Sequence, residues 1–283
     1  MNAIEIKNLS KRYDDFELRD LTLSLPEGSI LGLAGENGAG KSTTIKLIMN
    51  TIERDFGSVT VLGHECTSPE FTDLKNDIGV VLDEANFPTV LNVKQVNKIM
   101  KNTFRNWDEE KYFELIRKFR LPKDKKFKDF SRGMKMKLSI AVALSHDPRL
   151  LVLDEATGGL DPLIRDEILD IFNDFTRDEG HSILMSSHIV SDIEKICDYF
   201  AFIHDGRLLL CDEKDKILSE YAVAKLSEEE FEAVPREAIH GYKKNAYEVE
   251  ALLKKDQAGS NIRFEHTSLE DIIIFLAREG ERI

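Results

Sequence analysis

A glycine-rich loop between a short apolar run and a helical pattern is the feature that most limits how this chain can fold. Residues 30–33 predict a short buried strand, and residues 41–49 have the spacing of a helix. Residues 35–42 read GENGAGKS, which fits the pattern GxxxxGK[ST]. Its glycines let the backbone curl so that N–H groups point inward, beside the positive end of the following helix. The segment therefore predicts a loop that binds the phosphates of a nucleotide.

The residue types in this loop suggest separate roles. Lys41 would place its ammonium between the β- and γ-phosphates, and Ser42 would offer its hydroxyl to a magnesium ion. The alternative is a glycine-rich turn before an ordinary helix, which the strand before the loop and the helix after it disfavour. The residues expected to contact nucleotide are Gly35, Glu36, Asn37, Gly38, Ala39, Gly40, Lys41, Ser42 and Thr43.

Two adjacent acids follow a second apolar run. Residues 150–153 predict a strand buried on both faces, and Asp154 and Glu155 come directly after it. In a phosphate-loop protein the first acid of such a pair holds the metal, usually through water. The second acid can orient and deprotonate the attacking water. The alternative is a pair of acids on a surface loop. A buried strand rarely ends in two acids unless a cation or a polar group lies nearby, and this disfavours the alternative.

Three further residues lie where a nucleotide could be reached. Asp83 and His188 each follow a predicted strand, at the carboxyl edge where ligands bind in α/β sheets, and His188 would face the γ-phosphate. Tyr13 lies in a loop between two early strands and could stack on an adenine ring. The alternatives are a solvated loop acid, a structural histidine and a surface tyrosine.

Length and pattern together predict the fold class. With 283 residues, of which 42% are hydrophobic, the chain fits one large α/β domain with a modest appendage. We expect a phosphate-loop NTPase core with a mostly parallel sheet, an antiparallel β subdomain and a helical subdomain. We expect this core to span residues 1–217, the helical subdomain about residues 86–148, and a small α+β appendage residues 218–283.

Composition also limits the partners of this chain. A net charge of −13 argues against a general nucleic-acid binder, which needs a basic face. Cys66, Cys197 and Cys211 are far apart and are expected to be reduced core thiols of a cytosolic protein. No N-terminal signal pattern and no apolar run of roughly 18 residues is present in the sequence, so another chain would supply any membrane-spanning helices.

With these motifs in order, residues 1–217 resemble the ATP-binding subunit of ATP-binding-cassette transporters. Tyr13 matches the family's adenine-stacking aromatic, SRGM at 131–134 its signature motif, GGLD at 158–161 the loop that links two subunits, and His188 its switch histidine. The segments FSRGMKMKL at 130–138 and SLED at 268–271 resemble the subgroup of two-component peptide exporters, such as bacitracin-resistance and phenol-soluble-modulin exporters.

The resemblance implies a mechanism and partners. ATP and Mg²⁺ would be bound in a head-to-tail homodimer, with Ser131, Gly133 and Asp161 of one copy facing the nucleotide of the other. The metal would be held by Ser42, Asp154 and Asp83, and Glu155 and His188 would be catalytic. The pair would drive export, of peptides or amphipathic compounds, through a separate polytopic transmembrane permease at the cytoplasmic face of the membrane, with no nucleic acid bound.

Two motifs depart from the family pattern. Asp83 stands where glutamine is usual, and a carboxylate binds metal more strongly but cannot donate a hydrogen bond. The signature reads SRGM where SGGQ is commoner, so Arg132 adds a cation near a partner-bound phosphate and Met134 removes an amide donor. The change at Asp83 would alter how its loop couples the nucleotide state to a membrane subunit, whereas the backbone donors at Ser131 and Gly133 survive the changes in the signature.

Other functions remain to be weighed against transport. A soluble cassette ATPase acting on nucleic acid would carry long coiled coils, and one acting on the ribosome would carry two cassettes and a basic linker. A small-molecule kinase would leave the SRGM helix and His188 unexplained. A regulatory module that never hydrolyses ATP is disfavoured by Glu155.

Overall fold

A six-stranded sheet forms the centre of the molecule. The computed structural model describes residues 1–83, 87–178, 180–259 and 262–277. The strand order is β10-β9-β3-β8-β7-β6, and every neighbouring pair is parallel except β10 with β9. Asp205 and Gly206, both at positive φ, make the tight turn between those two strands. The strands are β3 (Ile30–Ala34), β6 (Ile78–Val81), β7 (Leu150–Asp154), β8 (Ser182–Ser187), β9 (Tyr199–His204) and β10 (Arg207–Glu213).

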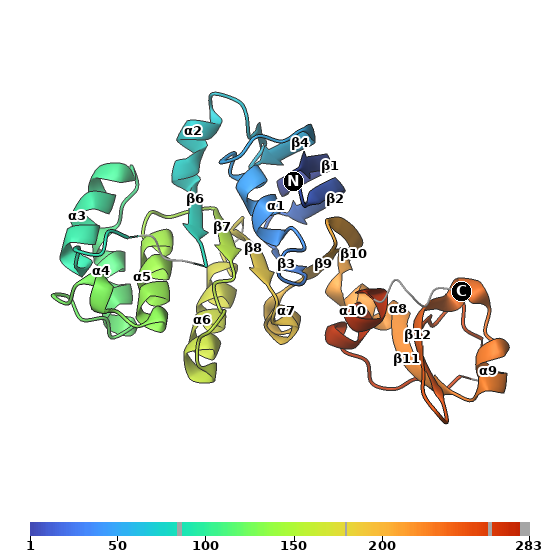
Figure 1. Cartoon of the computed structure of the whole chain (residues 1–283). Helices are drawn as coiled ribbons and strands as arrows, with labels where there is room; N and C mark the ends of the chain where they lie inside the picture. The colour runs from blue at the N-terminus through green and yellow to red at the C-terminus, as the bar shows by residue number, and fades with distance from the viewer. Residues whose placement is uncertain (84–86, 179, 260–261, 278–283) are drawn as a thin grey trace.

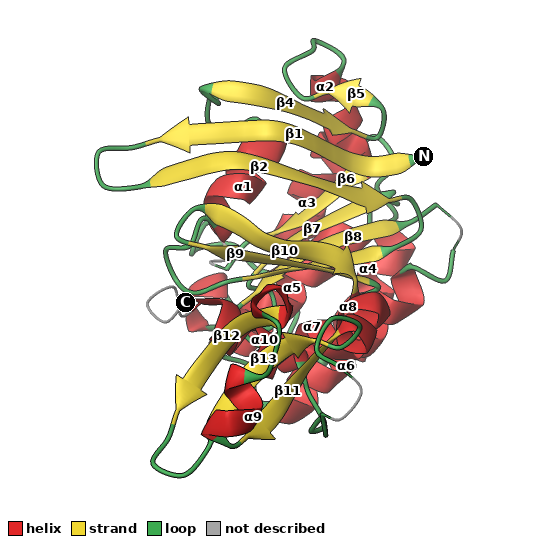
Figure 2. Ribbon diagram, turned by 90° about the vertical axis from the view of Figure 1, so that its right-hand side faces the viewer, coloured by secondary structure: helices red, strands yellow, loops and turns green. Residues whose placement is uncertain are grey.

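An antiparallel sheet lies beside the central sheet, above it in Figure 2. Its order is β2-β1-β4-β5, and Leu21, Leu23 and Leu25 of β2 are buried while the residues between them are exposed. Helix α1 (Lys41–Ile48) packs between the two sheets, because its apolar side chains share one core with both. This packing fixes the start of α1, and so the end of the glycine-rich loop. The strands are β1 (Asn2–Arg12), β2 (Glu17–Pro26), β4 (Phe56–Val61) and β5 (His64–Glu65).

Helices gather at the β6 edge of the central sheet (Figure 1). Asn92 caps one of them by accepting a hydrogen bond from Gln95 N, and Ser131 caps another. The segment 121–129 carries several charged residues, yet Leu121 and Phe127 are buried because their apolar side chains pack in the core with these helices. The elements are α2 (Phe71–Leu74), η1 (Lys75–Asp77), α3 (Val93–Thr103), α4 (Glu109–Lys118), η2 (Phe127–Asp129) and α5 (Arg132–Leu144).

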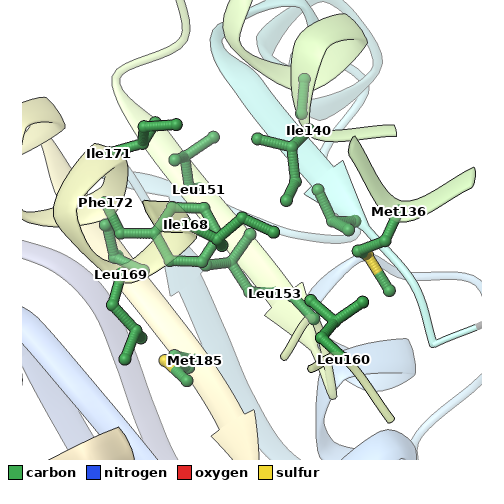
Figure 3. Close-up of a cluster of buried hydrophobic side chains, with 14 of the residues drawn as sticks. Met136, Ile140, Leu151, Leu153, Leu160, Ile168, Leu169, Ile171, Phe172 and Met185 are labelled. Atoms are coloured by element: carbon green, nitrogen blue, oxygen red, sulfur yellow. The ribbon is translucent and has the colours of Figure 1, made fainter. Parts of the chain in front are cut away.

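The main core holds the carboxyl end of β7 in place (Figure 3). Phe172 and Leu169 of α6 (Pro162–Phe175) pack with Leu151 and Leu153 of β7 and with Met185 of β8. Each fully buried side chain of this size contributes about 1.5–3 kcal/mol. Helix α7 (Val190–Ile196) follows β8 and packs against β3. The packing of β7 and β8 in this core therefore fixes the positions of the polar residues at their carboxyl ends.

The C-terminal segment forms a three-stranded antiparallel sheet, β11-β13-β12, with its own small core. Asp271 N donates to Ser268 Oγ and Ser268 N donates to Asp271 Oδ2, at 3.2 and 2.9 Å, which caps the last helix. That helix packs on α7, where Leu269 N donates to Glu194 Oε2 at 3.1 Å. The elements are α8 (Lys214–Glu220), β11 (Tyr221–Leu226), α9 (Glu228–Glu232), η3 (Arg236–Ala238), β12 (Ile239–Lys244), β13 (Val249–Lys254) and α10 (Leu269–Ala277).

The predicted fold class is confirmed: a mixed α/β molecule with a mostly parallel sheet and antiparallel sheets. The division into domains stays a prediction. Its boundary at 217/218 falls within α8, and the expected start of the helical subdomain at residue 86 and the chain end at 278–283 lie outside the described residues. Within the described ranges, none of the helices combines the length and apolarity that crossing a bilayer requires.

Candidate nucleotide-binding site

The glycine-rich loop joins β3 to α1 as the sequence predicts. Gly38 and Gly40 have φ of 86° and 117°, which a residue with a Cβ rarely adopts, so glycine is needed at both positions. Gly35 has a different role, since an added Cβ would lie 2.5 Å from the carbonyl oxygen of Ile203 in β9. Gly35 and buried Ala39 therefore lie on the side of the loop that packs against the rest of the fold.

Lys41 is held inside the loop by backbone oxygens. Its Nζ donates to the carbonyl oxygens of Gly35 and Glu36 at 2.7 and 3.2 Å, and the side chain is only 5% exposed. Glu155 Oε1 lies 3.1 Å from the same ammonium, at the distance of an ion pair but without the angles of a hydrogen bond. The cation of the glycine-rich loop and the acid that follows β7 thus lie next to each other at the carboxyl edge of the central sheet.

Asp154 lies beneath Ser42. Its Oδ1 accepts hydrogen bonds from Ser42 Oγ at 3.2 Å and from Ser186 Oγ at 2.6 Å. Ser186 belongs to β8, and its Oγ also accepts from Glu155 N at 3.2 Å. Sequence reasoning missed Ser186, although its place at the end of β8, two residues before His188, was an available signal.

Glu155 and His188 form a second contact at the same edge. His188 Nδ1 and Glu155 Oε2 are 2.6 Å apart, and His188 N donates to the same oxygen at 3.3 Å. Because an ionised carboxylate only accepts hydrogen bonds, Nδ1 must carry the proton in this contact. Glu155 also has φ of 52°, a strained value for a residue with a side chain, of the kind found at functional sites.

A cavity of about 550 Å³ opens above these residues. Tyr13 is partly exposed at its wall, and its ring centroid lies 6.5 Å from that of Phe16, a second aromatic that sequence reasoning missed. The polar groups at the bottom and the aromatic rings at the wall match the two ends of a nucleotide. The lining residues are Tyr13, Asp15, Phe16, Glu36, Asn37, Gly38, Gly40, Lys41, Ser42, Thr43, Asp83 and Glu155.

The oxygen atoms in this site fit a magnesium ion. Ser42 Oγ and Asp154 Oδ1 converge, and Asp83 lines the same cavity. Among the described residues, no three acidic, histidine or cysteine side chains form a metal cluster. Magnesium is usually bound by one or two carboxylates together with substrate phosphates and water, so such a cluster is not needed.

Three of the predicted nucleotide contacts lie away from this cavity. Ser131 caps α5 by accepting from Met134 N at 3.3 Å, and Asp161 caps α6 by accepting from Ile164 N at 3.1 Å. A Cβ added to Gly133 would be 3.6 Å from Leu160 and Ile164 side chains, which is ordinary contact. Within one chain these residues start helices, and their role toward a second copy stays a prediction.

Two residues that depart from the family pattern contact each other. Arg132 Nη2 lies 2.7 Å from Asp83 Oδ1, in a pair whose side chains are 57% and 49% exposed. A Cβ added at Gly159 would lie 2.6 Å from Arg132 Nη1, so the guanidinium rests on the GGLD loop. The sequence indicated each departure separately and not their contact.

A buried acid also supports the GGLD loop. Burial raises the pKa of Asp192 in α7, while the nearby Thr157 hydroxyl and the charge of Arg165 lower the pKa in part. Arg165 Nε lies 3.8 Å from Asp192 Oδ2, and its Nη2 donates to Leu160 O at 3.2 Å. This network connects the helix after His188 to the loop after Glu155.

The fold and the site define a phosphate-loop ATPase cassette, and comparison with known proteins gives its family. The family model described as ABC transporter matches residues 18–158. The lantibiotic transport ATP-binding protein SrtF of Streptococcus pyogenes is 35% identical over 215 residues, which are 75% of this chain and 91% of SrtF. The bacitracin transport ATP-binding protein BcrA of Enterococcus faecalis is 34% identical over 212 residues, covering 73% and 68%.

A solved structure agrees with these relatives. The ATP-binding subunit of an ABC transporter superposes with a TM-score of 0.69 at 29% identity, covering 77% of this chain and 92% of that one. The chain therefore belongs to the ATP-binding proteins of ABC transporters, a family of ATP-binding cassettes that hydrolyse ATP. The predicted resemblance is confirmed, and bacitracin and lantibiotic transport proteins are among the relatives, in line with the subgroup that the sequence suggested.

Proposed function

We propose that this chain powers export as the ATP-hydrolysing subunit of an ABC transporter, working as a head-to-tail pair of identical copies on a separate polytopic membrane subunit. The observation that carries this proposal is the convergence of Lys41, Asp154 and Glu155 at the carboxyl edge of the central sheet. The names of two relatives, a lantibiotic transport and a bacitracin transport ATP-binding protein, support a role in transport. The cargo would be a peptide or an amphipathic compound, and the chain would lie at the cytoplasmic face of a membrane.

In this proposal each residue of the site has one task. Lys41 binds the β- and γ-phosphates, which would replace the carbonyl oxygens that it now contacts. Ser42, Asp154 and Asp83 would hold Mg²⁺, which supplies charge neutralisation on the phosphates. Glu155 accepts the proton of the attacking water, and His188 orients Glu155 through the 2.6 Å contact with Oε2.

A second copy would complete the site. The cavity is open at its wall, so the γ-phosphate end needs a cover that excludes water. Ser131 and Gly133 at the start of α5, together with Asp161 at the start of α6, would supply that cover from the other copy. ATP binding would then close the pair, and repulsion between ADP and phosphate would open it.

The membrane subunit would contact the helices α3–α5 and the segment 83–92. Residues 84–86 of that segment lie outside the described residues. Asp83 lines the cavity, and its ion pair with Arg132 connects the cavity to α5. Closure of the pair of copies would therefore move this segment and the helices.

Purification from detergent-solubilised membranes tests this proposal. We expect the tagged chain to recover a polytopic membrane chain and to hydrolyse ATP faster with that chain than alone. A matched preparation of Glu155→Gln should recover the same partner, with turnover lower by about 10²–10⁴-fold. Recovery with ribosomes or nucleic acid, and with no membrane chain, would support a soluble cassette ATPase instead.

A further inference from the structure

The ion pair between Asp83 and Arg132 joins the nucleotide cavity to the signature helix. Asp83 follows β6 and lines the cavity with Lys41 and Ser42, whereas Arg132 is the first residue of α5. Their contact, Arg132 Nη2 to Asp83 Oδ1 at 2.7 Å, is made across 49 positions of sequence. Two of the three residues that depart from the family pattern therefore contact each other within a single chain.

The place of the guanidinium is built by the loop after Glu155. Gly159 has φ of 67°, and a Cβ there would collide with Arg132 at 2.6 Å. A Cβ at Gly158 would lie 3.7 Å from Arg132 Nη2. Arg132 of the SRGM motif thus lies against the GGLD loop and pairs with Asp83 after β6. Its position therefore depends on both of these other segments.

A cation at 2.7 Å from a carboxylate oxygen weakens the attraction of that carboxylate for any other cation. We propose that Arg132 competes with the nucleotide's magnesium ion for Asp83. Binding of the metal draws Asp83 away and releases Arg132 toward the face that a second copy would cover. This inference rests on the nucleotide and metal site of the proposed function, and it concerns the regulation of that site.

The chain contains a matched control pair. Arg105 Nη2 lies 2.7 Å from Asp73 Oδ1, with side chains 66% and 72% exposed, and neither residue lines the nucleotide cavity. Exposed ion pairs contribute little to stability, so both Arg132→Gln and Arg105→Gln should leave the melting temperature nearly unchanged. A difference between them in metal dependence therefore reports on the site and not on folding.

The experiment measures Kd for ADP by calorimetry on the purified full chain, once with excess Mg²⁺ and once with EDTA. The ratio of Kd with EDTA to Kd with Mg²⁺ measures how much the metal strengthens ADP binding. It separates this contribution of the metal from the direct attraction between Arg132 and phosphate. We expect Arg132→Gln to raise this ratio by about two- to fivefold, the factor that corresponds to an exposed ion pair. Arg132→Lys, which keeps a cation, should stay near wild type, and Arg105→Gln should not change the ratio.

Asp83→Asn completes the cycle. It should lower the ratio, and Arg132→Gln should have no further effect in the Asp83→Asn background, because the contested carboxylate is gone. A ratio that is unchanged or lowered in Arg132→Gln overturns the inference. The proposed function fails separately: it is contradicted if Lys41→Ala binds ADP as wild type does, whatever the Arg132 variants show.

Discussion

Lys41 Nζ lies 3.1 Å from Glu155 Oε1, so the residue expected to bind phosphates touches the residue expected to activate water. The two side chains are 5% and 12% exposed, which places this ion pair in a region of low dielectric. Glu155 is in turn fixed by His188, and its backbone N–H is held by Ser186. A single chain of contacts therefore connects the loop at 35–42, the end of β7 and the end of β8.

Lys41→Ala should lose nucleotide affinity, by at least about tenfold, because a charge-assisted hydrogen bond to phosphate is removed. Calorimetry with ADP checks this. Lys137→Ala is the matched control, since Lys137 is also mostly buried and pairs with Glu167 at 2.8 Å outside the cavity. Equal ADP affinity in wild type and Lys41→Ala would contradict the placement of phosphates at this loop.

Ser186→Ala should lower both the stability of the chain and the effect of Mg²⁺ on ADP binding. It removes the donor 2.6 Å from Asp154 Oδ1 and leaves that buried carboxylate with fewer partners, at a cost of about 1–3 kcal/mol in unfolding free energy. It should also reduce the stimulation of ADP binding by Mg²⁺, because Asp154 is less well oriented. Urea unfolding and a Mg²⁺ titration measure the two effects.

Ser187→Ala is the control for that variant. Ser187 is equally buried in β8, but its Oγ accepts from Ile189 N and has no contact with Asp154. It should cost stability without changing the Mg²⁺ titration. If Ser186→Ala and Ser187→Ala shift the titration alike, Ser186 does not position the metal ligand.

Stability should fall below about pH 6.5 through His146. Burial lowers the pKa of His146 from its ordinary value of 6.5, and hydrogen bonds with Val142 O and Ile78 O offset this shift only in part. A lowered pKa in the folded chain means that the unfolded chain binds more protons in that window, so unfolding is favoured as pH falls.

His146→Gln should therefore flatten the dependence of Tm on pH between pH 7.5 and 5.5. Loss of the stacked contact with Phe104 would lower Tm by the same amount at every pH, so the slope and not the value of Tm is the measurement. A wild-type slope in the variant would show that another group is responsible.

Much of the site could be predicted because its motifs are local. The loop at 35–42 and the acids after β7 are set by neighbours in sequence, and strand ends of a parallel sheet meet at one edge. Phe16 and the contact of Asp83 with Arg132 could not be predicted, because they depend on how distant segments pack. The hydrogen bond from Ser186 to Asp154 depends on the same packing, although the place of Ser186 near His188 was a signal in the sequence. The burial of Phe127 also depends on long-range packing, because its neighbours in sequence are mostly charged.

The central claim is that Lys41, Asp154 and Glu155 form one centre for ATP hydrolysis. Phosphate release and ATP binding, measured on the same preparation of Glu155→Gln, test it most directly. We expect ATP affinity to be kept, turnover to fall by about 10²–10⁴-fold, and a closed dimer to accumulate on size exclusion with ATP. Glu167→Gln, outside the cavity, should behave as wild type. Hydrolysis by Glu155→Gln at the wild-type rate would contradict the claim.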